Sequence, residues 1–333
     1  MAELRWNPLL GTYTMVASNR QNRPNMPADG CPFCPGEGKK VPADYEVMSY
    51  LNDFPALSAN PPAMSIDSDD LYEVEPAYGR CEVVLYSPEH NIRLYELSDV
   101  HVLKLVELWA ERFEELRKDK HIRYIFEFEN RGAEVGVTMP HPHGQIYGYP
   151  FVPQKLQVEL DNAKWHYDIY ETNLFDLILE KEKKFQKRIL FESETFLVFL
   201  PFFTDYPYGV FILSKNEDHL YITDLSKEQK MELGQILKKV VGMFDHVYDK
   251  LFPFMMCIHQ GAVNSEEYPE KEQRNYYRFH IEFYPPLRTA DAVKYYASSE
   301  MGAWAAANTR AVEETAVELL DALKKFESIK PYA

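Results

Sequence analysis

The feature that most constrains the fold is an order of predicted elements that occurs twice along the chain. In the first half, a strand at 81–87, a helix at 98–117 and a strand at 124–129 precede His141-Pro-His-Gly-Gln145. The second half is predicted to contain strands at 195–200 and 209–214, a helix at 226–248, and strands at 254–260 and 277–284, the last with His280-x-Glu282-x-Tyr284. A repeat period of about 140 residues is too long for a solenoid and indicates two copies of one α+β domain.

The helix starts support this order. Ser98 is a favourable N-cap, and Ser226 and Gln229 have the spacing of a capping box. A mostly helical, charged stretch at 154–187 separates the two repeats, and a last helix is predicted at 310–325. We therefore expect two domains, 1–155 and 156–333.

Composition restricts the class of protein and its partners. The 333 residues are 46% hydrophobic, which is enough for sizeable cores and excludes a disordered or collagen-like chain. Lys and Arg number 36 against 52 Asp and Glu, a net charge of −16, so we expect neither nucleic acid nor a membrane as partner. The charged N-terminal residues and the lack of a run of about 18 apolar residues predict a cytoplasmic location.

The segment His141-Pro-His-Gly-Gln145 carries the most specific chemistry. On an extended backbone, His141, His143 and Gln145 project from one face. A neutral imidazole can attack phosphorus if its other nitrogen donates its hydrogen to a carbonyl or carboxylate, and a Gln amide can donate to a phosphoryl oxygen. The residues alone leave a second interpretation open, a metal-binding or simply hydrogen-bonded pair of histidines.

The four cysteines are too few for a disulfide framework. Cys31 and Cys34 form a C-x-x-C pair in a loop rich in Pro and Gly, which by itself is weak evidence for a metal site. Cys81 and Cys257 lie in apolar runs and are interpreted as small buried hydrophobic residues.

The string FENRGAEVGVTMPHPHGQI at 128–146 resembles the active-site segment of the galactose-1-phosphate uridylyltransferases, in the histidine-triad (HIT) superfamily. Further resembling blocks, in family order, are Arg5-x-Asn-Pro-Leu9, Asn19-Arg-x-x-Arg-Pro24, Cys31/Cys34, Asn52-Asp-Phe-Pro-Ala-Leu57, Ser87-Pro-Glu-His90 and Phe279-His-x-x-Phe-Tyr-Pro-Pro286. The resemblance implies two tandem HIT-like domains, each an antiparallel sheet with packed helices, related by internal duplication.

The resemblance also implies a nucleotidyltransferase of galactose metabolism. It would exchange UMP between UDP-glucose and galactose 1-phosphate by double displacement, with His143 as the nucleophile and Gln145 as the phosphoryl-oxygen donor. The implied substrate-binding residues are Arg20, Arg23, Asn52, Asn130, Gly136, Thr138, Lys294, Tyr295 and Glu300. Thr138 stands where the family has Ser. The family is homodimeric, which implies a homodimer with an active site completed across the interface.

Two metal sites are implied. Cys31, Cys34, His90 and His141 match a structural zinc site. A second site, described with iron in the family and here expected to hold iron or a second zinc, is matched by Glu159, His259 and His280, but its third His is Glu282. A harder oxygen ligand thus replaces a nitrogen, and a metal-free, ion-paired cluster with Arg278 is the alternative. Since Glu282 also corresponds to His143 across the repeat, we expect no nucleophile in the second half.

Two other functions remain open. A nucleotide-sugar phosphorylase or adenylyltransferase of the same superfamily would use the same nucleotidyl-histidine chemistry, and Gly144 favours the uridylyl enzymes over it. A zinc-stabilised nucleotide-binding regulator without turnover would not need His143 and Gln145, which are both present.

Overall fold

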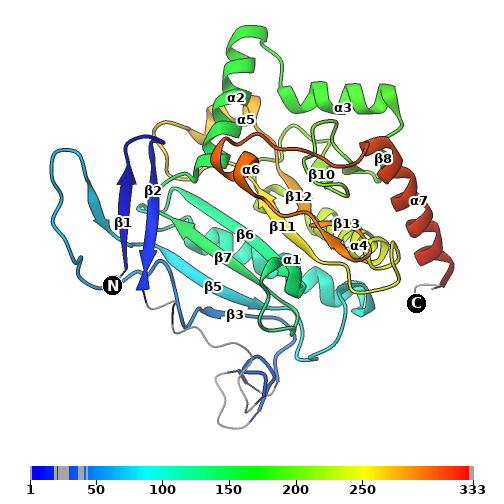
Figure 1. The fold of residues 1–333 in the computed structure, drawn as a ribbon, viewed down its shortest axis with the longest axis horizontal. Helices are drawn as coiled ribbons and strands as arrows, with labels where there is room; N and C mark the ends of the chain where they lie inside the picture. Colours follow the sequence, from blue (N-terminus) through cyan, green and yellow to red (C-terminus); the bar gives the residue numbers. More distant parts are fainter. Residues whose placement is uncertain (1, 19–20, 22–29, 37–40, 43, 330–333) are drawn as a thin grey trace.

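The computed structural model describes residues 2–18, 21, 30–36, 41–42 and 44–329. Its main feature is one nine-stranded sheet, in the order β3-β5-β7-β6-β11-β12-β10-β9-β8 (Figure 1). All neighbouring strands in it are antiparallel. The strands are β3 (Met48–Leu51), β5 (Arg80–Leu85), β6 (Tyr124–Arg131), β7 (His143–Tyr149), β8 (Ile189–Glu192), β9 (Phe196–Phe199), β10 (Val210–Ser214), β11 (Phe254–His259) and β12 (His280–Tyr284).

The elements predicted from the repeated order are confirmed. The first half contributes β5, α1 (Asp99–Leu116), β6 and β7, and the second half contributes β10, α4 (Lys227–Asp245), β11 and β12. The order β5-β7-β6 is followed in the sheet by β11-β12-β10, so equivalent strands lie at mirrored positions about the β6–β11 pair. The Ser98 and Ser226 side chains accept hydrogen bonds from the backbone N–H groups of His101 and Gln229, as expected of N-caps.

The two halves do not form separate sheets. Strands β6 and β11 pair directly, with Phe128 opposite Cys257 and Arg131 opposite Phe254. Each strand would otherwise be an edge with unpaired backbone groups, and the pairing satisfies both edges. The result is an α+β fold in which both halves of the chain contribute strands to one β-sheet.

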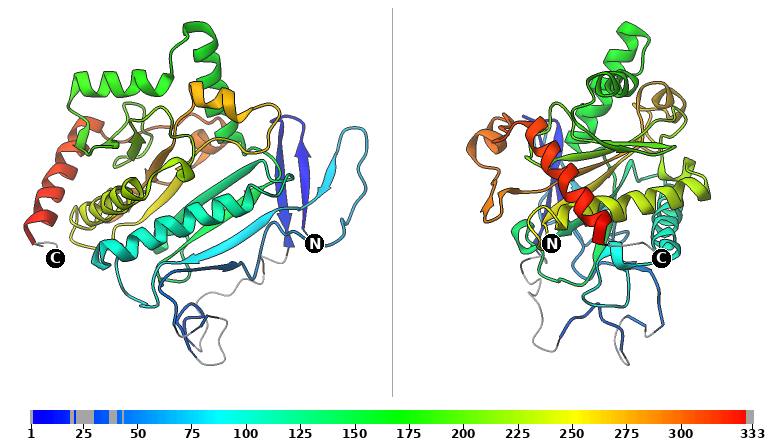
Figure 2. Two further views of the ribbon diagram at one scale, coloured as in Figure 1. Left: turned by 180° about the vertical axis from the view of Figure 1, so that it is seen from behind. Right: turned by 90° about the vertical axis from the view of Figure 1, so that its right-hand side faces the viewer.

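Helices α1 and α4 lie side by side across one face of this sheet (Figure 2). One core cluster draws on both halves, with Trp109 and Phe113 from α1 and Leu237 and Phe244 from α4. Helix α7 (Val312–Ile329) packs beside α4. The opposite face of the sheet carries His143, Gln145 and Phe128, because residues alternate between the faces of a strand and Gly144 and Ile146 point to the core.

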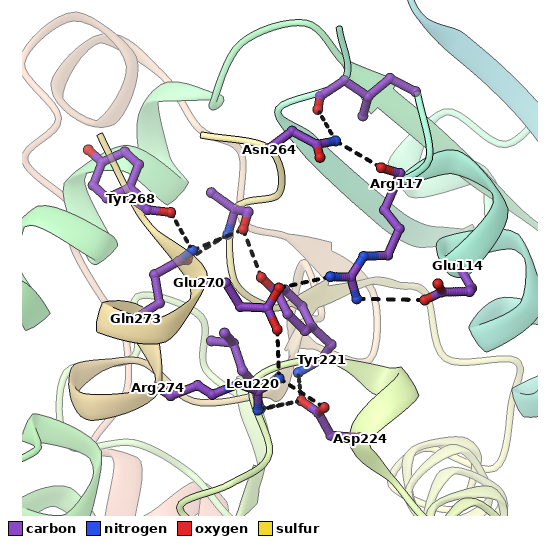
Figure 3. A network of polar contacts seen from close by, with 12 residues as sticks. Glu114, Arg117, Leu220, Tyr221, Asp224, Asn264, Tyr268, Glu270, Gln273 and Arg274 are labelled. Carbon is purple, nitrogen blue, oxygen red and sulfur yellow. Dashed lines mark hydrogen bonds and ion pairs between the residues drawn. The ribbon is translucent and has the colours of Figure 1, made fainter. Parts of the chain in front are cut away.

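A polar network joins the end of α1 to the loop between β11 and β12 (Figure 3). The Asn264 amide donates to the carbonyl oxygens of Arg117, Asp119 and Ile122 at 2.9–3.1 Å. The Arg117 guanidinium also donates to Glu270, 2.8 Å away on α5 (Glu270–Tyr276). The Asn264 amide thus binds the C-cap carbonyl of α1 and two carbonyls of the loop that follows, and with the Arg117–Glu270 pair it connects the two halves of the chain.

The remaining elements lie around the main sheet. The predicted helical stretch at 154–187 forms α2 (Gln154–Tyr170) and α3 (Leu174–Phe185), and α6 (Ser298–Gly302) precedes α7. Two small sheets consist of β1 (Ala2–Asn7), β2 (Thr12–Ala17) and β4 (Val74–Pro76), and of β13 (Leu287–Thr289) and β14 (Ala292–Val293). Within the described ranges, every helix is too short or too polar to cross a bilayer.

Candidate active site

His143 is the first residue of β7, and a hydrogen bond sets the tautomer of its ring. Its Nδ1 lies 2.7 Å from the carbonyl oxygen of His141. A carbonyl can only accept, so Nδ1 carries the hydrogen and Nε2 carries the lone pair. The ring of Phe33 packs against the imidazole with 4.9 Å between centroids. This is the arrangement that a nucleophilic imidazole requires.

Gln145 lies two residues further along the same face of β7. Its amide oxygen accepts hydrogen bonds from Asn52 Nδ2 at 3.3 Å and from the Tyr147 hydroxyl at 3.4 Å. Because both neighbours donate to it, this end of the amide is the oxygen, Oε1. The NH2 group at the other end can therefore donate a hydrogen bond to a ligand. Asn52 is itself held because its Oδ1 accepts from the backbone N–H of Phe54 at 2.9 Å.

A cavity of about 210 Å³ opens beside these two residues. It is lined by Phe128, Asn130, Gly136, Val137, Thr138, His143, Gln145 and Tyr147. The structure thus brings together five of the residues singled out from the sequence. Gly136 has a φ of +79°, which explains the glycine, and the buried Thr138 hydroxyl has no hydrogen-bond partner within the described structure.

The three residues expected near the hexose do not line this cavity. Lys294 is buried, and its Nζ donates to the backbone carbonyl of Asp205 at 2.7 Å. Tyr295 is 75% exposed, and the Glu300 carboxylate accepts from the backbone N–H of Ala297. Arg20 and Arg23, expected near the phosphates, lie outside the described residues.

The predicted zinc ligands converge from three separate segments. One ligand atom each from Cys31, Cys34, His90 and His141 lies within 4.8 Å of the others. Cys34 Sγ is 3.3 Å from His90 Nδ1 and 3.6 Å from His141 Nδ1, close to the spacing of about 3.6 Å between sulfur and nitrogen on tetrahedral zinc. The donor chemistry and spacing therefore fit zinc.

The orientation of His141 agrees with this role. Its Nε2 donates to the carbonyl of Ser87 at 2.8 Å, which directs the Nδ1 lone pair toward the thiols. Burial lowers the pKa of His141 and favours the neutral ring that a metal needs. Tyr45 was not expected from the sequence; its hydroxyl donates to the same carbonyl at 2.7 Å.

A second group that could hold a metal ion consists of Glu159, His259 and His280, whose ligand atoms also lie within 4.8 Å of one another. Glu282 lies outside this set of three. In the metal-free alternative Arg278 was to pair with this cluster, and that part of the alternative is wrong, because its guanidinium bonds to Asp176 at 2.6 Å. The cation beside Glu282 is Lys155, with Nζ 2.8 Å from Glu282 Oε2. Sequence reasoning missed Lys155, although it precedes Glu159 by one helical turn.

Comparison with known proteins gives a consistent result. Residues 1–153 match the family model of the galactose-1-phosphate uridyl transferase N-terminal domain, and residues 154–329 match that of the C-terminal domain. Galactose-1-phosphate uridylyltransferase from Thermotoga maritima is 36% identical over 96% of this chain and 98% of its own length. The Haemophilus influenzae enzyme of that name is 30% identical over 89% and 88%.

Solved structures of similar fold cover nearly the whole chain. One described as uridylyltransferase has a TM-score of 0.87 at 32% identity and covers 97% of this chain and 99% of its own. An ADP-glucose phosphorylase from Arabidopsis thaliana has a TM-score of 0.71 at 22% identity and covers 96% and 99%, a likeness of fold alone.

Proposed function

Because the chain belongs to the galactose-1-phosphate uridylyltransferase family, we propose that it exchanges UMP between UDP-glucose and galactose 1-phosphate through a uridylyl group held on His143. The chain is an enzyme, a nucleotidyltransferase of galactose metabolism. The observation that carries the proposed mechanism is the hydrogen bond from His143 Nδ1 to the His141 carbonyl, since it leaves the lone pair on Nε2.

The reaction consists of two displacements at the same phosphorus atom. His143 Nε2 attacks the α-phosphorus of UDP-glucose, a P–N bond forms, and the bond to the bridging oxygen breaks as glucose 1-phosphate leaves with the electron pair. A phosphate oxygen of galactose 1-phosphate then attacks the same phosphorus. The P–N bond breaks, UDP-galactose forms, and the neutral imidazole is restored. The Gln145 amide donates to a non-bridging oxygen while charge develops on it.

The substrate contacts follow from the cavity beside His143. We assign Asn130, Gly136 and Thr138 to the nucleotide, with the Thr138 hydroxyl as an available partner and Asn52 holding Gln145. Arg20 and Arg23 are assigned to the phosphates. Lys294, Tyr295 and Glu300 are assigned to the hexose and its phosphate, and because they do not line this cavity we propose a homodimer in which a second copy presents them.

We propose zinc at Cys31, Cys34, His90 and His141, where it would hold three distant segments together and orient the strand that begins with His143. The family resemblance also implies iron or a second zinc at Glu159, His259, His280 and Glu282. The surroundings of Glu282 argue against that assignment.

The mirrored strand order supports an internal duplication with a boundary near residue 155, and the first half keeps the nucleophile. We also propose that the enzyme acts in the cytoplasm. None of its four cysteines, all in the described residues, forms a disulfide, as expected in a reducing compartment.

Incubation with UDP-glucose alone tests the mechanism. Intact-mass analysis should show a uridylyl adduct and an equivalent amount of released glucose 1-phosphate. The adduct should be absent in His143→Ala and present in the control His121→Ala, a variant of an exposed histidine. If His143→Ala forms the adduct equally well, the assignment of the nucleophile is wrong. ADP-glucose in a parallel reaction tests the adenylyl alternative, for which no adduct is expected.

A further inference from the structure

A second carboxylate, that of Glu282, lies beside the second group of metal-type ligands, Glu159, His259 and His280. Glu282 occupies the position of a family histidine, and its side chain is only 5% exposed. Its Oε1 lies 3.4 Å from His280 Nε2, and its Oε2 lies 3.6 Å from His259 Nε2. A second buried carboxylate brings a negative charge that needs a compensating cation.

Lys155 supplies that cation. It lies at the start of α2, and its Nζ donates to Glu282 Oε2 at 2.8 Å and is 3.7 Å from Glu159 Oε1. The ammonium also contacts the Tyr284 hydroxyl and lies 4.5 Å from the centroid of that ring. Lys155 is 60% exposed while the carboxylates below it are largely buried, so it covers the cluster from the solvent side.

The carboxylate of Glu159 is also committed to hydrogen bonds. Its Oε2 accepts from His259 Nδ1 at 2.8 Å and from the Tyr277 hydroxyl at 3.0 Å. At 2.8 Å these two atoms are hydrogen-bonded and lie closer together than the about 3.4 Å that separates two ligands of one tetrahedral zinc ion. His259 therefore presents one ring nitrogen to Glu159 and the other toward Glu282. Both carboxylates of the cluster thus have protein donors: His259 and Tyr277 for Glu159, and Lys155 and Tyr284 for Glu282.

We propose that Lys155 replaces the second metal ion of the family and that Lys155, Glu159, His259, His280 and Glu282 form a metal-free clamp. The clamp joins α2 to β11 and β12, because Lys155 and Glu159 belong to the helix and the other three to the strands. The clamp lies on the same face of the sheet as the active site. Residues opposite each other in neighbouring strands share a face, and the opposite pairs are Gln145 with Phe128, Phe128 with Cys257, and Cys257 with Glu282. Three strand spacings put the clamp about 14 Å from Gln145.

Metal content of the full-length chain tests the proposal first. Purified wild-type protein should contain about one zinc per chain, in the cysteine site. His259→Gln should leave that content unchanged. Cobalt(II) added to the zinc-loaded wild type should produce no ligand-field absorption from the second group.

Removal of the ammonium should open the site. Lys155→Ala, with zinc retained at the cysteines, should bind one additional Co²⁺ per chain at least about tenfold more tightly than the wild type, because a positive charge next to the ligands is gone. His259→Gln combined with Lys155→Ala should abolish that binding. Lys164→Ala, which removes a surface lysine paired with Asp168 on the same helix, is the matched control and should behave as wild type.

Two results would overturn the proposal. One is a second metal in the wild-type protein that His259→Gln removes. The other is a Lys155→Ala protein that keeps its circular dichroism and melting transition but gains no cobalt, because the ammonium would then not be what excludes the ion. If Lys155→Ala does not fold, Lys155→Gln removes the charge and keeps a donor for Glu282, and the same two results apply to it.

Discussion

Gly144 lies between the two residues on which the chemistry depends, and it has almost no room for a side chain. A Cβ built on it would be 2.4 Å from the Tyr86 hydroxyl and 3.0 Å from the backbone oxygen of Phe128. The φ of Gly144 is not positive, so steric space and not backbone conformation demands the glycine. The Tyr86 hydroxyl is buried beside the Glu129 carboxyl and has no hydrogen bond of normal geometry within the described structure.

We therefore predict that Gly144→Ala destabilises the protein by about 1–3 kcal/mol, the usual cost of overpacking. It should also lower turnover, because β7 carries both His143 and Gln145. Tyr86→Phe alone should be nearly neutral, and in combination it should recover part of the loss. Urea unfolding of the two single variants and the double variant measures this coupling. Additive effects would show that the Phe128 backbone, and not Tyr86, limits the space.

The buried carboxyl of Glu129 should make the free energy of unfolding depend on pH. Burial raises the pKa of Glu129 to about 7, above that of the unfolded chain. Between the two pKa values the native state binds more protons than the unfolded state, so the free energy of unfolding falls as pH rises from about 4.5 through 7. Glu129→Gln should remove this dependence and raise stability at pH 8 by about 3 kcal/mol, with a much smaller effect at pH 5.

Urea unfolding at both pH values measures this difference, with Glu217→Gln, at an exposed position, as control. An equal effect of Glu129→Gln at pH 5 and pH 8 would contradict the buried, protonated carboxyl.

Sequence reasoning predicted that His143 and Gln145 share one strand face and that Cys31, Cys34, His90 and His141 come together, because these predictions depend on short spacings and on a resemblance whose blocks run through most of the chain. It did not identify Lys155, Phe33 or Tyr45. A lysine in a charged helix is normally a surface residue, and nothing in its local sequence shows that Glu282 lies beside it. That contact exists only because α2 packs on β12, more than a hundred residues away along the chain.

At the scale of elements, the end of α1 depends on one side chain from the other half of the chain. Asn264 has a φ of +50°, a conformation that asparagine tolerates better than most residues. Its amide donates to the C-cap carbonyl of α1 and to two carbonyls of the loop between α1 and β6. We predict that Asn264→Ala lowers the free energy of unfolding by about 2 kcal/mol, through the lost hydrogen bonds and the less favourable backbone.

Asn264→Gly separates the two causes, since glycine keeps the backbone conformation and removes only the amide. It should retain part of the stability in the same chemical denaturation experiment. If Asn264→Ala unfolds like the wild type, the amide contacts contribute nothing at this helix end.

The type and limits of most elements were predictable because amphipathic periodicity and capping are local. Helix α1 begins after Ser98 and α4 after Ser226, as the capping residues indicated. The pairing of β6 with β11 was not predictable, because either strand could have remained an edge or paired elsewhere. Strands β1 and β2 were not among the predicted elements, because they lie outside the repeated order.

At the scale of the whole molecule, the cysteine site links segments that are far apart in the chain, at 31–34, 90 and 141. We predict that Cys31→Ser loses about one zinc per chain, lowers the melting temperature and reduces uridylyl transfer, because a structural zinc contributes folding free energy and His141 holds His143. Elemental analysis and calorimetry measure the first two effects. Cys81→Ala, at a buried cysteine outside this group, is the control and should keep its zinc. Unchanged zinc in Cys31→Ser would refute the assignment.

The β6–β11 pairing has a consequence for how the protein can be divided. Cleavage in the short connection between β7 and α2, at residues 150–153, would break the chain but leave all the hydrogen bonds between β6 and β11 intact. Separating the two fragments would expose one unpaired strand edge and part of the common core on each, so we expect the cleaved halves to stay together or to recombine. The backbone hydrogen bonds between β6 and β11 and the shared core, rather than the covalent connection, therefore hold the two halves together.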